Sequence, residues 1–198
     1  MKNITISFGV LLLILLSQNV IGQFTFASKF GVNIANVRNT SAYNYSILFH
    51  YNTGIIAKYD LLSKFLLTTE ILLSNKGYSE LIIPNGTTTN KLTYLSVPIL
   101  TEYKASKNVY FQLGPEINYL IAAQQKNDDL KKSIYEKYKK LDIAIAGGLG
   151  FKLSKSIALE TRYTRGLTQI VNTNRYFETF KTNTLQLNFV YQFTNTKK

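Results

Sequence analysis

The sequence predicts an all-β protein: an eight-stranded antiparallel up-and-down transmembrane β-barrel with a polar, side-chain-filled lumen. Three observations predict it, namely an N-terminal secretory signal, eight segments in which apolar and polar residues alternate, and connections that are short and long in turn. The composition agrees, because Tyr and Phe, with 14 and 12 copies, favour strands. A chain of 198 residues is long enough for one such domain with a targeting segment.

The first 22 residues, MKNITISFGVLLLILLSQNVIG, have the features of a cleaved secretory signal peptide. Lys2 precedes an apolar run, a polar Ser-Gln-Asn break follows it, and Val20 and Gly22 are small enough for a signal-peptidase site. The alternative is an uncleaved anchor, but the apolar run is shorter than the roughly 20 residues that a spanning helix needs. We expect cleavage before Gln23 and a barrel domain over residues 23–198.

Composition excludes several kinds of chemistry. The chain has no Cys, which rules out disulfides, thiol catalysis and thiolate metal sites. Its net charge of +12 and pI near 9.7 favour an anionic partner, either nucleic acid or a membrane surface. The lysines are dispersed and no nucleic-acid-binding motif is present, so we expect no nucleic acid and instead contact with anionic lipid head groups.

Alternation with period two begins in the segment FTFASKFGVNIA. Phe26, Phe30 and Val32 share one face, and Lys29 and Asn33 share the other. Each such segment has about the length that a tilted strand needs to cross a bilayer, roughly 9–11 residues. The seven further segments are 47–59, 65–76, 92–104, 109–120, 141–153, 156–167 and 184–193.

The connections alternate in length as the turns and loops of an outer-membrane barrel do. Those with the letters LLSK, ASKN and SK are tight, and the others run to between 11 and 20 letters. Pro98 and Pro115 lie inside predicted strands and cannot donate a ladder hydrogen bond. We therefore expect these two prolines at bulges or near strand ends.

Side-chain size indicates which face is outside. A soluble lipocalin-like barrel would place its apolar residues inside. Here the polar face has many small residues, such as Ala27, Gly31 and Gly148, which suit the narrow lumen of an eight-stranded barrel. The apolar face has bulky residues suited to lipid. Tyrosines near strand ends are expected at the membrane–water interfaces. Those near the periplasmic ends are Tyr59, Tyr103 and Tyr191, and Tyr51, Tyr119 and Tyr163 share their outward phase.

Charged residues fall on the inward face. In the segment IALETRYT, Glu160 and Arg162 share that face, and the planar guanidinium of Arg162 is suited to pair with several carboxylates. Glu70, Glu116 and Glu160 are its expected partners. The predicted lumen charge network comprises Lys58, Glu70, Glu116, Lys152, Glu160 and Arg162, with Lys76 and Glu102 in the same phase.

No residue pattern indicates an enzyme. Paired carboxylates serve glycoside hydrolysis, but here each has a basic residue in the same phase that keeps it ionised. His50 stands without a Ser or Cys partner motif, so we interpret it as a polar filler. No metal spacing or nucleotide fingerprint is present, and GGLG at 147–150 lies inside a strand. We expect no catalytic residue, no metal and no cofactor.

Five stretches, in this order, resemble a known family: HYNTGIIAKYDLLSKFLLTTEILLSNKGY, LTYLSVPIL, VYFQLGPEINYL, IAGGLGFKL and LETRYTRGLTQI. They resemble the porin-like outer-membrane β-barrel family of Bacteroidetes, to which the PorT-type barrels are related. The resemblance spans essentially the whole chain after residue 22 and implies an eight-stranded barrel in the bacterial outer membrane. Ser96 stands where that family often has Glu. The resemblance implies no particular activity.

Function is then expected in the outer loops. The 124–140 loop is basic, and it is either a short amphipathic helix touching lipopolysaccharide phosphates or a solvated strand extension; its surface lysines are Lys131, Lys132, Lys137, Lys139 and Lys140. We expect a non-enzymatic barrel with a structural, adhesive or envelope- or secretion-complex role. Alternatives are a narrow small-solute porin and, less favoured, a barrel enzyme. Expected partners are outer-membrane lipid, lipopolysaccharide, the barrel assembly machinery and an unidentified envelope protein. The last strand, TLQLNFVYQF, resembles the aromatic signal that the assembly machinery reads, although TNTKK follows its final Phe.

Overall fold

A computed structural model describes residues 24–38, 48–82, 86–127, 130–172 and 180–193. The predicted signal peptide and its cleavage site lie outside these residues. The strands are β1 (Phe24–Arg38), β2 (Leu48–Leu62), β3 (Phe65–Ile82), β4 (Gly86–Lys104), β5 (Val109–Asn127), β6 (Leu130–Ser133), β7 (Leu141–Lys152), β8 (Ile157–Gly166) and β9 (Lys181–Gln192). A single 3₁₀ turn, η2 (Tyr135–Lys137), stands between β6 and β7 among the described residues. No helix among them is long and apolar enough to cross a membrane.

Eight of the strands form a closed antiparallel barrel, as predicted. Each pairs with its neighbour in the chain, β5 pairs with β7, and β1 pairs with β9 to close the ring. The short strand β6 is outside the ring and pairs only with the end of β5. Closure satisfies the backbone groups of both edge strands, which a membrane environment requires because it offers no water as partner.

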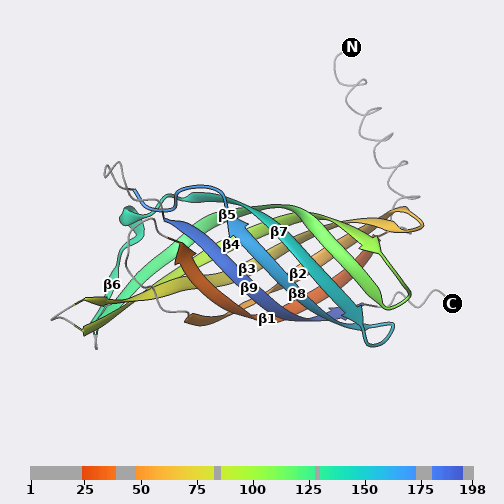
Figure 1. Ribbon diagram of the computed structural model, residues 1–198, viewed down its shortest axis with the longest axis horizontal. Helices are drawn as coiled ribbons and strands as arrows, with labels where there is room; N and C mark the ends of the chain where they lie inside the picture. The colour runs from red at the N-terminus through yellow and green to blue at the C-terminus, as the bar shows by residue number, and fades with distance from the viewer. Residues whose placement is uncertain (1–23, 39–47, 83–85, 128–129, 173–179, 194–198) are drawn as a thin grey trace, which may run out of the picture.

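The barrel has two different ends (Figure 1). At the turn end, short connections join β2 to β3, β4 to β5 and β7 to β8, and β1 begins and β9 ends there. At the loop end lie the longer connections, with β6 and η2. Outer-membrane barrels place short turns in the periplasm and long loops outside the cell.

The inward and outward faces follow the sequence phase. Outward residues are exposed all around the barrel, among them Phe30, Leu113 and Leu187, whereas Lys29, Glu70 and Arg162 are fully buried in the lumen. Bulky apolar side chains therefore form the outer wall, and the charges are inside. At the turn end, aromatic rings pair on this wall, with centroids 5.1 Å apart for Phe65 and Tyr103.

The two prolines differ from expectation. Pro98 and Pro115 lie well inside β4 and β5, and neither stands at a bulge. The β3–β4 ladder breaks between Thr69 and Leu72, and the β4–β5 ladder breaks between Pro98 and Thr101, but the register is the same on both sides of each gap. The missing donors thus interrupt pairing locally without bending the strand out of the sheet.

The loop end differs from the predicted loops. β3 and β4 continue their pairing to Ile82 and Gly86, so the 77–91 connection is a long hairpin and not an irregular loop. The letters PNG, Pro84 to Gly86, predict a hairpin tip there; Pro84 lies outside the described residues, and Gly86 pairs with Ile82. Of the two alternatives for the 124–140 segment, the strand extension is correct: β5 runs to Asn127 and pairs with β6, and the only helical part described there is η2.

Candidate functional site

The centre of the lumen holds a cluster of four charges. Arg162 on β8 donates to both carboxylate oxygens of Glu70 on β3, at 2.9 and 2.7 Å. Its Nη2 also lies 3.5 Å from Glu160, and Lys29 on β1 lies 2.8 Å from Glu70 and 2.7 Å from Glu160. All four side chains are buried. The cluster has two positive and two negative charges, so it is electrically balanced without water or counterions.

Neutral groups complete this cluster. The hydroxyl of Tyr110 donates to Glu160 at 2.8 Å, and the amide of Gln112 donates to Glu160 at 3.1 Å while accepting from Arg162 at 2.7 Å. The strand phase of Gln112 predicts its place among the polar groups of the lumen, whereas the predicted charge network did not include Lys29 or Tyr110. The phase of Lys29 on the first strand contained the signal, because it faces inward with Gly31 and Asn33.

Further ion pairs lie on either side of the central cluster. Lys58 pairs with Glu102 at 2.8 Å, and Lys76 pairs with Glu116 at 2.9 Å. Glu116 is therefore not a partner of Arg162 as expected; it lies with Lys76 and accepts from Thr164 at 3.3 Å. Strand phase predicts that these charges share the inward face, but it does not reveal which of them touch.

Lys152 lies apart from these pairs, at the turn-end mouth. It is half-buried and lines a small cavity of about 90 Å³ together with Lys58 and Glu102. Its ammonium lies 5.9 Å from the centroid of the Tyr110 ring. The residue belongs to the lumen by position but to no ion pair among the described residues.

An apolar cluster fills the loop end of the lumen. Leu92, Tyr94 and Leu120 from the barrel wall are fully buried beneath Ile134 and Ile170 from the loop-end connections. Hydrogen bonds hold this cover in place: the amide of Ile134 donates to the carbonyl of Ala123 at 3.0 Å, and Tyr138 pairs in β-fashion with Val171. The expected polar lumen is thus polar in its middle and apolar at its loop end. In the sequence, Leu92, Tyr94 and Leu120 already fall in the inward phase of their strands, which indicates an apolar part of the lumen.

The arrangement offers little for catalysis. Both candidate carboxylates, Glu70 and Glu160, contact two cations each, which stabilises their ionised form and leaves no open face for a substrate. His50 is half-buried near the loop end. Within the described ranges, no group of three or more His, Asp or Glu residues is placed to hold a metal ion.

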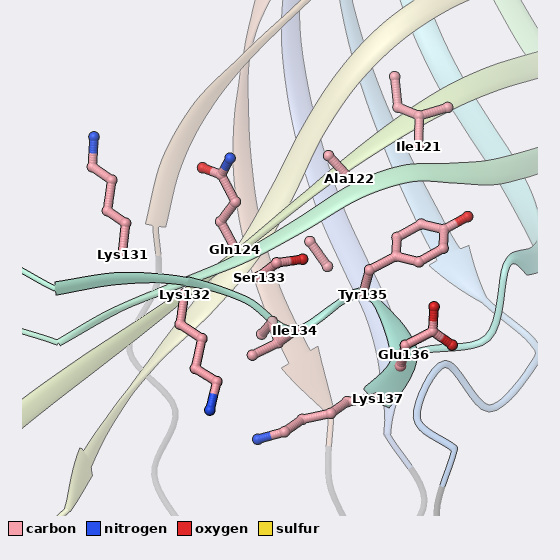
Figure 2. Close-up of a pocket in the computed structure, with 11 residues that line it drawn as sticks. Ile121, Ala122, Gln124, Lys131, Lys132, Ser133, Ile134, Tyr135, Glu136 and Lys137 are labelled. Carbon is pink, nitrogen blue, oxygen red and sulfur yellow. The ribbon is translucent and has the colours of Figure 1, made fainter.

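A groove of about 650 Å³ lies outside the barrel at the loop end, between the end of β5 and the segment that includes β6 and η2 (Figure 2). A β-bulge on β5 adjoins it. Tyr94 pairs with Leu120 but Thr93 pairs with Ala122, so Ile121 is an extra residue on β5. Bulges bend a strand and redirect its side chains. Beyond this point β5 stays paired with β4 as far as Asn127, and β6 replaces β7 as its other neighbour.

The groove has an apolar part and a basic part. Ile121, Ala122 and Tyr135 line the first, and the hydroxyl of Tyr135 donates to the carbonyl of Leu120 at 3.2 Å. Lys131, Lys132 and Lys137 line the second, with Glu136 as an acidic neighbour. These three lysines, with Lys139 and Lys140, are exposed. In Figure 2 Lys131 points to the same side of the ribbon as Gln124, and Lys132 points to the other side.

Comparisons with known proteins show which family has this architecture. A family model described as "Outer membrane protein beta-barrel domain" matches residues 16–172. No curated protein sequence matches the chain.

Solved structures of bacterial outer-membrane barrels have a similar fold. Neisserial surface protein A aligns with a TM-score of 0.58 at 13% identity, covering 85% of this chain and 97% of that one. Ail of Yersinia pestis aligns with a TM-score of 0.51 at 14% identity, covering 86% and 99%. OprG of Pseudomonas aeruginosa aligns with a TM-score of 0.51 at 13% identity, covering 86% and 95%. At such identities the likeness concerns the fold alone.

Proposed function

Because this chain belongs to the outer membrane protein β-barrel domain family and is a protein of the bacterial outer membrane, we propose that it is a non-enzymatic, non-conducting barrel that acts through its loop end at the cell surface. The role is structural, adhesive or that of a subunit of an envelope or secretion complex. We also propose the finer kinship with the porin-like barrels of Bacteroidetes, including the PorT-type barrels, and recognition of β9 by the barrel assembly machinery.

One observation supports the proposal most directly: the described lumen is filled by side chains in two different ways. The middle holds the Lys29–Glu70–Glu160–Arg162 cluster with its flanking ion pairs. The loop end holds the apolar cluster under Ile134. A solute would have to separate buried ion pairs, each of which is expensive to break, and then displace packed apolar groups.

The loop end, by contrast, offers extended surface. β3, β4 and β5 continue beyond the rest of the ring, and with β6 they form one projecting sheet in which each strand pairs with the next (Figure 1). Binding sites are commonly found on such projections from a rigid scaffold. Ail, which has this fold, has been crystallised in complex with the heparin analogue sucrose octasulfate. For the present chain the proposal depends on its own exposed lysines.

Planar-bilayer recording tests the first half of the proposal. The refolded chain should give no steady single-channel steps, while a porin inserted in the same bilayers gives them. Heat-modifiable electrophoretic mobility of the recovered protein would show that it inserted folded. Steady steps from the folded chain would contradict the proposal and favour the narrow small-solute porin.

Cross-linking in intact cells tests the second half. A photo-reactive residue at exposed Gln124, on the loop end, should capture an envelope component or a surface ligand. The same probe at exposed Lys155, on the turn end, is the matched control. Capture only from the turn end would contradict a role at the loop end. A barrel enzyme that used Glu160 and His50 would instead lose turnover in the Glu160→Gln and His50→Ala variants.

A further inference from the structure

The outer face of the projecting sheet carries rows of polar and basic side chains. Directly opposed residues of an antiparallel pair point to the same side of the sheet, as do residues two positions apart along one strand. In the first row, Lys126 on β5 lies opposite Thr89 on β4 and opposite Lys131 on β6. Both lysines are exposed, and Thr89 is partly exposed. Two lysines of adjacent strands therefore stand side by side on this face.

The next row of the same face, two residues nearer the barrel wall, adds a third lysine. Gln124 lies opposite Lys91 and opposite Ser133. Figure 2 shows Lys131 and Gln124 on one side of the ribbon, as the register requires, and Lys132 on the other side. We call this surface the outward patch, and its residues are Thr89, Lys91, Gln124, Lys126, Lys131 and Ser133.

The positive charge of the outward patch is not balanced by ion pairs. Among the described residues, no Asp or Glu forms an ion pair with any of its three lysines. Like charges in directly opposed cross-strand positions destabilise a pair of strands, and Lys126 and Lys131 are opposed in this way. Over residues 124–140 the sequence has six lysines against three acidic residues. An anionic group between Lys126 and Lys131 would remove their repulsion and stabilise the sheet.

Most of the outward patch lies beyond the lipid head groups. The outward apolar row of β5 ends at Ile121, and Lys126 follows five residues later. With a rise of about 3.4 Å per residue and a tilt of about 40°, Lys126 is roughly 13 Å further out than Ile121. The polar layer of a bilayer is only about 5–7 Å thick on each side. Lys91 is nearer to this layer, with its ammonium 5.6 Å from the centroid of the outward Tyr51 ring. A lipid phosphate would therefore meet Lys91 but not the Lys126–Lys131 pair.

The chemistry of the outward patch suits a sugar chain better than a protein. The cores of protein–protein interfaces are apolar and rich in aromatic residues, whereas all six residues of the patch are polar or basic. The neutral residues between the lysines have hydroxyl and amide groups that donate to and accept from sugar hydroxyls. The ammonium groups form charge-assisted hydrogen bonds with carboxylate or sulfate groups.

From these observations we propose that the outward patch binds an anionic polysaccharide outside the cell, with the sugar chain crossing β6, β5 and β4. One sulfate or carboxylate group lies between Lys126 and Lys131, and a second contacts Lys91. The sugar hydroxyls contact the neutral residues of the patch. The assignment rests on the proposed function, because it requires the loop end to be outside the cell.

The test uses the full mature chain in nanodiscs of zwitterionic lipid, with binding followed by fluorescence polarisation. The probe is a fluorescent chondroitin sulfate oligosaccharide, and the competitors are neutral dextran, inorganic sulfate and a polyglutamate peptide of equal charge. The test variant is Lys131→Gln. Its matched control is Lys132→Gln, the next residue of β6, which points to the opposite side of the ribbon. Both lysines are exposed, so neither substitution removes a buried contact.

Two triple variants extend the comparison. The patch variant replaces all three lysines of the outward patch by Gln. The turn-end variant, Lys64→Gln/Lys107→Gln/Lys155→Gln, removes the same charge from exposed residues at the other end of the barrel.

We expect Lys132→Gln and the turn-end variant to bind the oligosaccharide with nearly the affinity of the native chain. A charge contact of about 4 Å in water contributes roughly fivefold in affinity, so Lys131→Gln should bind about fivefold more weakly. The patch variant should bind on the order of 100-fold more weakly. Neutral dextran and inorganic sulfate should not displace the probe. Polyglutamate should displace it only weakly, because it has no hydroxyl groups for the neutral residues of the patch.

Equal binding by Lys131→Gln and Lys132→Gln would overturn the assignment, as would an equal loss in the patch and turn-end variants. Displacement by inorganic sulfate at the same concentration of sulfate groups would show a site for a free anion. Displacement by polyglutamate as effective as by unlabelled oligosaccharide would show a site for an acidic polypeptide. Either displacement would also overturn the assignment.

The outcome is separable from that of the experiments on the proposed function. A barrel that conducts ions, but whose Lys131→Gln variant binds the oligosaccharide more weakly than Lys132→Gln, would overturn the proposed function and leave the patch assignment standing. A silent barrel that captures an envelope protein at Gln124, with equal binding by the two lysine variants, would do the reverse.

Discussion

Arg162 shows how single residues stabilise the lumen. A buried guanidinium is costly to desolvate, and the cost is offset only where its donors meet partners of good geometry. Here Glu70 accepts two parallel hydrogen bonds, and Gln112 accepts a third. Lys29 then neutralises the second glutamate, Glu160. The cluster is therefore a mutually dependent unit, and the loss of any member leaves a buried charge without its partner.

Arg162→Met should lower the free energy of unfolding by about 3–5 kcal/mol, because it leaves two buried carboxylates facing one lysine. Denaturant unfolding of the barrel in lipid vesicles, followed by circular dichroism, measures the change. Arg165→Met is the control, since Arg165 is exposed and faces outward on the same strand. Its change should be within about 0.5 kcal/mol or stabilising. Equal effects of the two substitutions would show that the central ion pairs contribute no stability.

At the scale of the elements, β7 provides the space that the neighbouring strands need. Its inward residues are small, including Ala144, Ala146 and Gly150. Gly150 lies opposite Tyr110 on β5 and opposite Glu160 on β8. The phenol ring of Tyr110 crosses over this glycine to reach the carboxylate. The small inward residues of β7 thus allow side chains of β5 and β8, its two neighbours, to form a hydrogen bond across it.

Gly150→Ala should destabilise the barrel by about 1–3 kcal/mol, the usual cost of overpacking. A Cβ atom at this position would lie 2.0 Å from the Tyr110 ring, which must move and release Glu160. Gly147→Ala is the control three residues earlier, where the nearest atom to a new Cβ is 3.6 Å away, an ordinary contact.

Denaturant midpoints in lipid vesicles compare the two glycine variants. The double substitution Gly150→Ala/Tyr110→Leu should recover part of the stability, because it removes the colliding ring. Equal midpoints for the native chain and Gly150→Ala would mean that Tyr110 does not occupy the space above Gly150.

The bulge at Ile121 is a second element with consequences beyond its strand. Without the extra residue, the inward positions of β5 would continue from Leu120 to Ala122 and Gln124. With it, Leu120 and Ala123 are both buried, while Gln124 and Lys126 turn outward. The same residue thereby separates the apolar cluster inside the barrel from the basic groove outside it.

The whole molecule distributes its residues in the opposite way to a soluble protein, with apolar side chains outside and charged side chains inside. Its outer wall exposes bulky apolar or aromatic residues on every strand of the ring, and its interior buries charge. Exposed apolar area of this extent indicates a contact surface, and for a closed barrel the contact is with lipid. The large apolar hollow between Phe30, Leu159 and Phe189, about 530 Å³, is part of this wall.

A charge on this wall should be costly in proportion to its depth. Leu113→Arg places a charge near the middle of the apolar row of β5 and should lower the free energy of unfolding in lipid by about 2–4 kcal/mol. Ile121→Arg, at the outer end of the same row, should cost only about 0–1 kcal/mol. Unfolding in vesicles measures both. A larger loss at Ile121 than at Leu113 would contradict the proposed position of the bilayer.

Strand phase predicted most of the fold. Alternation in eight segments identified the ring strands, because a closed barrel with lipid outside needs opposite polarities on the two faces of every strand. It also placed Glu70, Glu160 and Arg162 on the inner face together. Phase could not predict how far β3, β4 and β5 extend at the loop end, where polarity alternates less strictly.

The sequence alone determined which side of each strand meets lipid, since that choice depends on local polarity and size. Only the tertiary structure decided which charges touch. Glu116 meets Lys76, 40 positions earlier, and Lys29 meets Glu160, 131 positions later, because barrel curvature and strand stagger bring distant residues together. The same holds for the groove, which adjoins the bulge at Ile121. Pairing register depends on the whole closed sheet, and no local pattern contains it.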